Sequence, residues 1–106
     1  MKPLLIGYMS ARGSATPRRL RDAETALASF AETEGYALGH VFIEPDSLRP
    51  TSALPELIAN ALRSGAAAVG VPTPQDLGRD AKTQELMRRR IERDACLPVV
   101  IVARSA

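Results

Sequence analysis

The feature that most constrains the fold is a regular alternation of short apolar runs with longer segments of helical periodicity. The apolar runs cover residues 4–9, 36–44, 66–72 and 97–103. Between them, residues 17–34, 54–64 and 79–95 repeat apolar side chains every three or four positions, as one face of a helix requires. Strands that alternate with such helices indicate βαβ units and a mostly parallel sheet.

Residues at the ends of these segments support the assignment. Thr16 and Pro17 suit the start of the first helix, and Gly35 suits its exit. The chain has 106 residues, which is ordinary for one domain. We therefore expect a single domain over residues 1–106, of the α/β class. It should have three layers, with four or five mostly parallel strands and helices on both faces.

The amino-acid composition excludes two kinds of site. The single histidine, His40, excludes a multi-histidine metal site, and the single cysteine, Cys96, excludes an internal disulfide. We expect Cys96 to be a small buried apolar side chain. The apolar runs are too short for a signal peptide or a membrane span, so we expect a cytoplasmic protein with no membrane contact.

Ligands of parallel sheets bind beyond the carboxyl ends of the strands, which here are residues 10–16, 44–52, 72–79 and 104–106. The first loop offers only Gly7 and Gly13 and no P-loop lysine, so a dinucleotide or P-loop site is not expected. The first strand ends in Met9 and Ser10 and the third in Pro72 and Thr73, so neither supplies a carboxylate for Mg²⁺. A Ser–His–Asp triad would need His40 from inside a strand. We expect no metal and no cofactor.

Metal-free phosphodiester chemistry remains open, because a serine hydroxyl can attack phosphorus while arginines neutralise the developing charge. The first loop contains Ser10 and Ser14, although each serine could instead satisfy backbone groups in a turn. Arginines lie in or beside the loops at the same edge: Arg12, Arg18, Arg19, Arg49 and Arg79. Guanidinium groups suit phosphate.

The net charge is only +2, but it is unevenly distributed. Residues 1–21 carry five basic residues and no acid, and residues 88–93 read RRRIER. This asymmetry indicates an anionic partner at one end of the molecule. The second run has two readings, a solvated helix face or a nucleic-acid contact.

Four segments together resemble the catalytic domain of resolvase/invertase-type serine recombinases: IGYMSARGS, GYALGHVFIEPD, LRPTSALPELIANALRSGAAAVGV and DLGRD. The resemblance covers residues 4–103. It implies a resolvase-like fold, DNA strand exchange by a serine nucleophile, and association of copies. The family pattern is G-Y-x-R-x-S after the first strand, R-P before the second helix, and D-R-L-G-R or S-R-L-G-R after the third strand.

The departures from this pattern bear on activity. Ser10 and Arg12 stand in reverse order, and Arg12 and Ser14 restore R-x-S only two positions later. Arg49 and Pro50 keep the R-P pair, also displaced by about two positions. In the last motif Leu77, Gly78 and Arg79 match, but Asp76 replaces the central arginine and Gln75 the acid before it.

The resemblance thus gives a set of weak or vestigial catalytic residues: Ser14, Ser10, Arg12, Arg49 and Arg79. It gives a phosphate-binding set of Arg12, Arg18, Arg19 and Arg79. A carboxylate at Asp76 repels a phosphate, and losing even one oxyanion stabiliser costs about 10²–10³ in rate. Asp76 could instead cap the helix that follows. The family continues into a long dimer helix and a DNA-binding domain, whereas this chain stops at Ala106.

Three hypotheses follow. The first is an inactive recombinase-like domain that serves as a binding, regulatory or oligomerisation module. The second is DNA strand cleavage through Ser14 or Ser10. The third is sequence-independent nucleic-acid binding by residues 12–21 and 88–93. The partners to expect are DNA at the basic loop edge, another protein, or a second copy of the chain.

Overall fold

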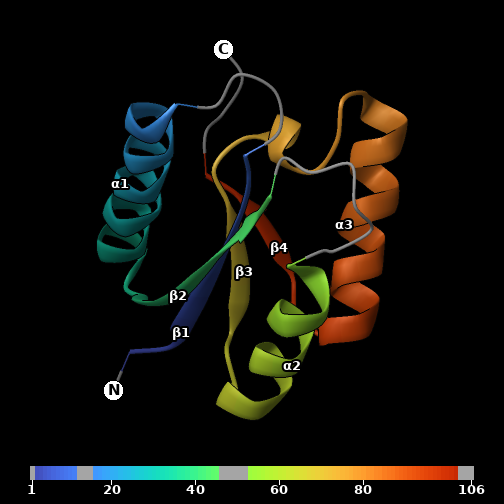
Figure 1. Cartoon of the computed structure of the whole chain (residues 1–106). Helices are drawn as coiled ribbons and strands as arrows, with labels where there is room; N and C mark the ends of the chain where they lie inside the picture. Colours follow the sequence, from blue (N-terminus) through green and yellow to red (C-terminus); the bar gives the residue numbers. More distant parts are fainter. Residues whose placement is uncertain (1, 12–15, 46–52, 103–106) are drawn as a thin grey trace.

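The computed structural model describes residues 2–11, 16–45 and 53–102. Along the chain its elements are β1 (Leu4–Ser10), α1 (Pro17–Glu34), β2 (Ala37–Glu44), α2 (Leu54–Ser64), β3 (Ala68–Val71), the short 3-10 helix η1 (Pro74–Asp76), α3 (Ala81–Ala95) and β4 (Val99–Ile101). The four strands form one parallel sheet in the order β2-β1-β3-β4 (Figure 1).

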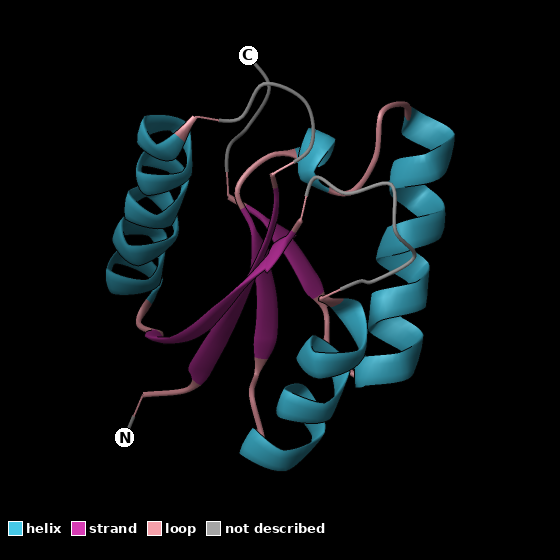
Figure 2. Cartoon of the chain, viewed as in Figure 1, coloured by secondary structure: helices cyan, strands magenta, loops and turns pink. Residues whose placement is uncertain are grey.

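The helices form the two outer layers of the fold. Figure 2 shows α1 on one face of the sheet and α2 with α3 on the other. Strand order explains this, because the chain steps from β1 to β2 in one direction and then crosses to β3 and β4 in the other. Right-handed crossovers in opposite directions place their helices on opposite faces. The prediction of a three-layer α/β fold with a parallel sheet is confirmed.

The core is divided by the sheet. On the side of α2 and α3, β1 and β3 bury apolar side chains against Leu57 and Ile91. On the side of α1, Leu5, Ala31 and Ala68 form a smaller cluster. Leu27 of α1 lies directly over the two strand glycines, because a Cβ built on Gly7 or Gly70 would meet its methyl groups at 2.9 or 3.2 Å. Small residues in the central strands thus let α1 approach the sheet closely.

Two predictions from the sequence need correction. Cys96 is exposed rather than buried, because it ends α3 in the left-handed conformation with φ 58° and so turns away from the core. The third helix begins at Ala81 rather than at residue 79, because the Asp80 carboxylate accepts a hydrogen bond from the Thr83 N–H and caps it there.

Candidate functional site

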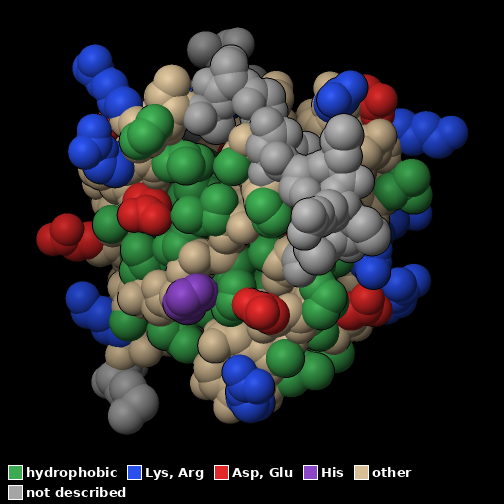
Figure 3. Space-filling model, viewed as in Figure 1, with side chains coloured by type: hydrophobic (Ala, Val, Ile, Leu, Met, Phe, Trp, Pro, Cys, Tyr) green, Lys and Arg blue, Asp and Glu red, His purple; other side chains and the backbone are tan. Residues whose placement is uncertain are grey.

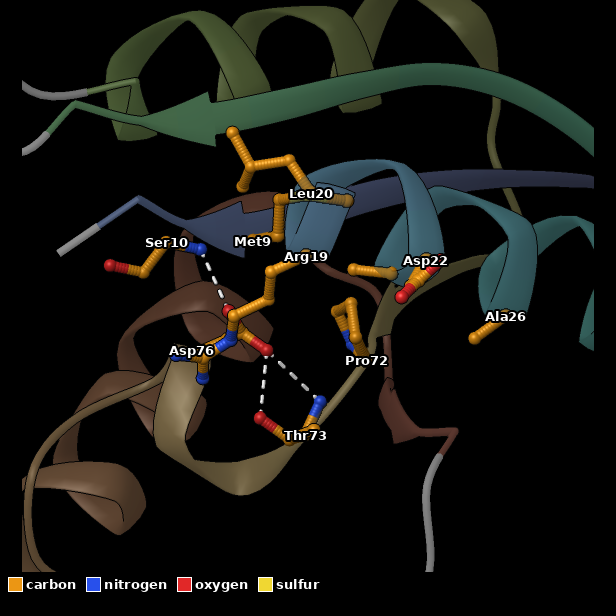
Figure 4. A pocket seen from close by; sticks show the side chains of 10 residues that line it. Met9, Ser10, Arg19, Leu20, Asp22, Ala26, Pro72, Thr73 and Asp76 are labelled. Atoms are coloured by element: carbon orange, nitrogen blue, oxygen red, sulfur yellow. Dashed lines mark hydrogen bonds between the residues drawn. The ribbon is translucent and has the colours of Figure 1, made fainter. Parts of the chain in front are cut away.

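A pocket opens where the chain changes direction across the sheet. After β1 the chain enters α1 on one face, and after β3 it enters α3 on the other, which is the kind of switch point at which open α/β sheets hold ligands. The pocket has a volume of about 240 Å³ (Figure 4). Its lining comes from three segments: Met9 and Ser10 of β1, Arg19, Leu20, Asp22, Ala23 and Ala26 of α1, and Pro72, Thr73 and Asp76 after β3.

Asp76 ties the end of β1 to the turn after β3. Its Oδ1 accepts a hydrogen bond from the Ser10 backbone N–H at 2.9 Å. Its Oδ2 accepts from the Thr73 N–H at 3.0 Å and from the Thr73 hydroxyl at 2.9 Å. Figure 4 shows these bonds converging on one carboxylate. Asp76 therefore closes a capping box on η1, and the expectation that it caps the following helix is wrong because Asp80 has that position.

Glu44 makes a second connection at the same edge. Its carboxylate accepts a hydrogen bond from the Tyr8 hydroxyl at 2.8 Å and lies 3.3 Å from the Ala53 N–H at the start of α2. Tyr8 is only 1% exposed, so its ring is part of the core while its hydroxyl reaches this carboxylate. Sequence reasoning missed Glu44. The available signal was an acid at the end of a strand next to a strand that ends in tyrosine.

The carboxylates of Asp76 and Glu44 make the carboxyl edge of the sheet less favourable for an anion. An anion site at strand ends needs N–H and hydroxyl donors that converge on open space. Here Asp76 and Glu44 accept from backbone N–H groups of three segments and from two hydroxyl groups. Among the described residues, these donors thus already face a carboxylate. A phosphate in the same place would meet two negative groups.

The predicted site residues are only partly brought together. Ser10 and Arg19 line the pocket, and Figure 4 shows both beside Asp76. Arg18 and Arg79 are exposed, and neither is among the residues that line the pocket. Arg12, Ser14 and Arg49 lie outside the described residues. Of the two catalytic candidates that the structure describes, Ser10 and Arg79, only Ser10 lines the pocket.

The second basic run is neutralised within its own helix. Ion pairs join Arg88 to Glu85 and Glu92, Arg89 to Glu85, and Arg90 and Arg93 to Asp94. Hydrogen bonds from Arg88 and then Arg89 lower the pKa of Glu85, and a hydrogen bond from Arg93 lowers the pKa of Asp94. These contacts favour the reading of residues 88–93 as a solvated helix face.

The basic start of α1 is different. Arg18, Arg19 and Arg21 are exposed, and no ion pair involves them in the part of the chain that the structure describes. Over the same residues, no group of three His, Cys, Asp or Glu side chains could hold a metal ion. No described helix is both long and apolar enough to cross a membrane.

Comparison with solved structures identifies the fold. The chain is similar to the C-terminal catalytic domain of ISC1926 TnpA, an IS607-like serine recombinase, with a TM-score of 0.73 and 16% identity over 96% of this chain and 71% of that one. A resolvase family site-specific recombinase from Streptococcus pneumoniae matches with a TM-score of 0.73 and 13% identity, covering 95% and 72%.

The N-terminal catalytic domain of TP901-1 integrase matches with a TM-score of 0.70 and 13% identity, covering 93% of this chain and 76% of that one. No family model and no curated protein sequence matches. The chain therefore has the fold of serine recombinase catalytic domains, as the sequence resemblance predicts. At 13–16% identity these matches show the fold alone.

Proposed function

We propose that this chain is a recombinase-fold domain that does not cleave DNA and acts as a binding, regulatory or oligomerisation module. The observation that carries the proposal is the Asp76 carboxylate, which accepts three hydrogen bonds at the position where the resembling family has an arginine. A guanidinium there would attract a phosphate, whereas this carboxylate repels it and holds the surrounding donors.

The Glu44 contacts support the same proposal. A phosphoryl transfer site needs positive groups aimed at the non-bridging oxygens in the transition state. Glu44 instead places a second carboxylate at the edge, held by the Tyr8 hydroxyl and close to the start of α2. A scissile phosphate at this edge would therefore meet the negative charge of two carboxylates.

The test is a search for a covalent DNA adduct. Purified protein is incubated with labelled duplex and single-stranded DNA and analysed on a denaturing gel. We expect no adduct from the wild-type chain. An adduct that disappears in Ser14→Ala or Ser10→Ala, and persists in the control Ser29→Ala on the exposed side of α1, would contradict the proposal and establish DNA strand cleavage.

Nucleic-acid binding without cleavage is the second candidate. The exposed arginines at the start of α1, which have no ion pair within the described residues, favour it. If this candidate is right, the affinity for DNA should fall steeply as the salt concentration rises, because phosphate contacts release counterions. The same labelled DNA, titrated at low and moderate salt, measures this. The matched variants are Arg18→Glu, which reverses a charge on α1, and Arg89→Glu, which makes the same change on α3. A loss confined to the first would place the contact at α1.

A further inference from the structure

One side of the molecule combines the outer strand β2, which has β1 as its only neighbouring strand within the described residues, with a regular stripe on the helix α1. We define the α1–β2 flank by Arg18, Arg21, Thr25, Ala28 and Glu32 of α1 and by Leu38, Val41 and Ile43 of β2. Five of its members line a groove of about 370 Å³ together with Glu24: Arg21, Thr25, Ala28, Leu38 and Val41. Figure 3 shows apolar side chains gathered over this side.

The helix stripe has an ordered charge pattern. Residues 18, 21, 25, 28 and 32 follow the three- and four-residue spacing of one helix face. The stripe is basic at the start of α1, small in the middle and acidic towards the end, and all five residues are exposed. Neither Arg21 nor Glu32 has an ion pair within the described residues.

This pattern opposes the stability of α1 on its own. The start of a helix favours acidic side chains and its end favours basic ones. The first turn of α1 contains no acid and its last turn no base. The charges of this stripe thus run against the dipole of their own helix. A second helix whose charges run in the opposite order would place an opposite charge beside each of them.

A second copy of the same helix, placed antiparallel, has that order of charges. A two-fold axis that crosses α1 midway between Thr25 and Ala28 also lies midway between Arg21 and Glu32. Arg21 of each copy then faces Glu32 of the other, and the small side chains meet at the axis. Leu27 lies at this level of α1 and packs over Gly7, which is in register with Val41 in the middle of β2.

We propose that the α1–β2 flank is a self-complementary interface through which two copies of this chain associate about a two-fold axis, with their α1 helices antiparallel. The half-buried Leu38 and Val41 and the 37% exposed Ile43 supply the apolar contact beneath the helices. Contact is through side chains, because the register shift between β1 and β2 disturbs the edge, a feature that discourages addition of another strand.

The inference rests on the function proposed above in that it gives the binding module a partner. The two can fail separately, because association is measured by mass and cleavage by a DNA adduct. A domain that forms the dimer and still cleaves DNA would overturn only the proposed function.

The experiment measures molecular mass by sedimentation equilibrium over a concentration series up to the millimolar range. The wild-type chain is expected to dimerise. Arg21→Glu and Glu32→Arg should each weaken dimerisation by about tenfold or more, because each places like charges opposite one another twice. Arg63→Glu on α2, also exposed, is the control with the same charge change and should dimerise like the wild type.

Mixing the two interface variants is the decisive step. Arg21→Glu and Glu32→Arg chains should form a mixed dimer more readily than either forms alone, because their charges are again complementary. Circular dichroism checks that each variant is folded. A wild-type chain that stays monomeric throughout, or variants that dimerise as it does, would overturn the proposal. Mixing that restores nothing would also overturn it.

Discussion

At the scale of single residues, the Asp76 side chain has a structural role at the sheet edge. Its carboxylate joins a backbone N–H at the end of β1 to a turn 66 residues further along the chain. Three donors therefore depend on one acceptor, and the acceptor is only partly exposed. The hydrogen bonds explain why a carboxylate is stable at a position where the recombinase resemblance leads one to expect a cation.

Asp76→Ala should destabilise the domain by about 1–3 kcal/mol, because it leaves two backbone N–H groups at the edge without their acceptor. The free energy of unfolding is measured by urea denaturation with matched slopes. Gln75→Ala, at the neighbouring exposed position, should change it by much less. Equal effects of the two variants would mean that the Asp76 bonds contribute nothing beyond the turn itself.

Sequence reasoning reached this residue but not its contacts. The motif comparison identified Asp76 as the departure that matters most, because a charge reversal is visible in the sequence alone. Its bonds to Ser10 and Thr73 depend on two loops meeting across the sheet edge. The prediction that Cys96 is buried was wrong for a local reason. Its position before an apolar run suggested burial, but its backbone adopts the left-handed conformation that ends α3.

At the scale of elements, α1 depends on the absence of side chains beneath it. Its boundaries could be predicted because capping is local: the Thr16 side chain accepts from the Arg19 N–H and Gly35 has φ 81°. The position at which α1 packs on the sheet could not be predicted, because it depends on which strand residues lie under Leu27. Gly7 and Gly70 come from neighbouring strands that are in register with each other.

Gly7→Ala should destabilise the fold by about 1–3 kcal/mol, because its Cβ would lie 2.9 Å from Leu27 Cδ1 and 3.1 Å from Val41 Cγ2. Gly70→Ala should cost less, since the nearest atoms are at 3.2 Å. Thermal unfolding of both variants, of Leu27→Ala, and of Gly7→Ala combined with Leu27→Ala tests the cause. If Leu27 is the obstacle, the double variant loses less than the two single losses together.

At the scale of the whole molecule, the sequence predicted the layers but not the strand order. Alternating strands and helices imply a parallel sheet by local pattern and connection length alone. The order β2-β1-β3-β4 places β1 and β3 between neighbours on both sides, with the pocket at the ends of these two strands. The edge with the candidate chemistry is thus supported by the two most buried strands, while the proposed interface lies on an outer strand.

This arrangement predicts an order of local stability across the sheet. Amide hydrogen exchange at low protein concentration should be slowest in β1 and β3, where Leu5, Ile6, Met9, Val69 and Val71 have no exposed surface. It should be faster in β2 and β4, whose outer backbone groups have no neighbouring strand among the described residues. Both central strands open only when the fold opens, whereas each edge strand can separate alone. Exchange from β4 as slow as from β3 would show that the edge is covered in solution. Protection that rises with protein concentration in β2 and α1, and not in β4, would locate the covering at the α1–β2 flank.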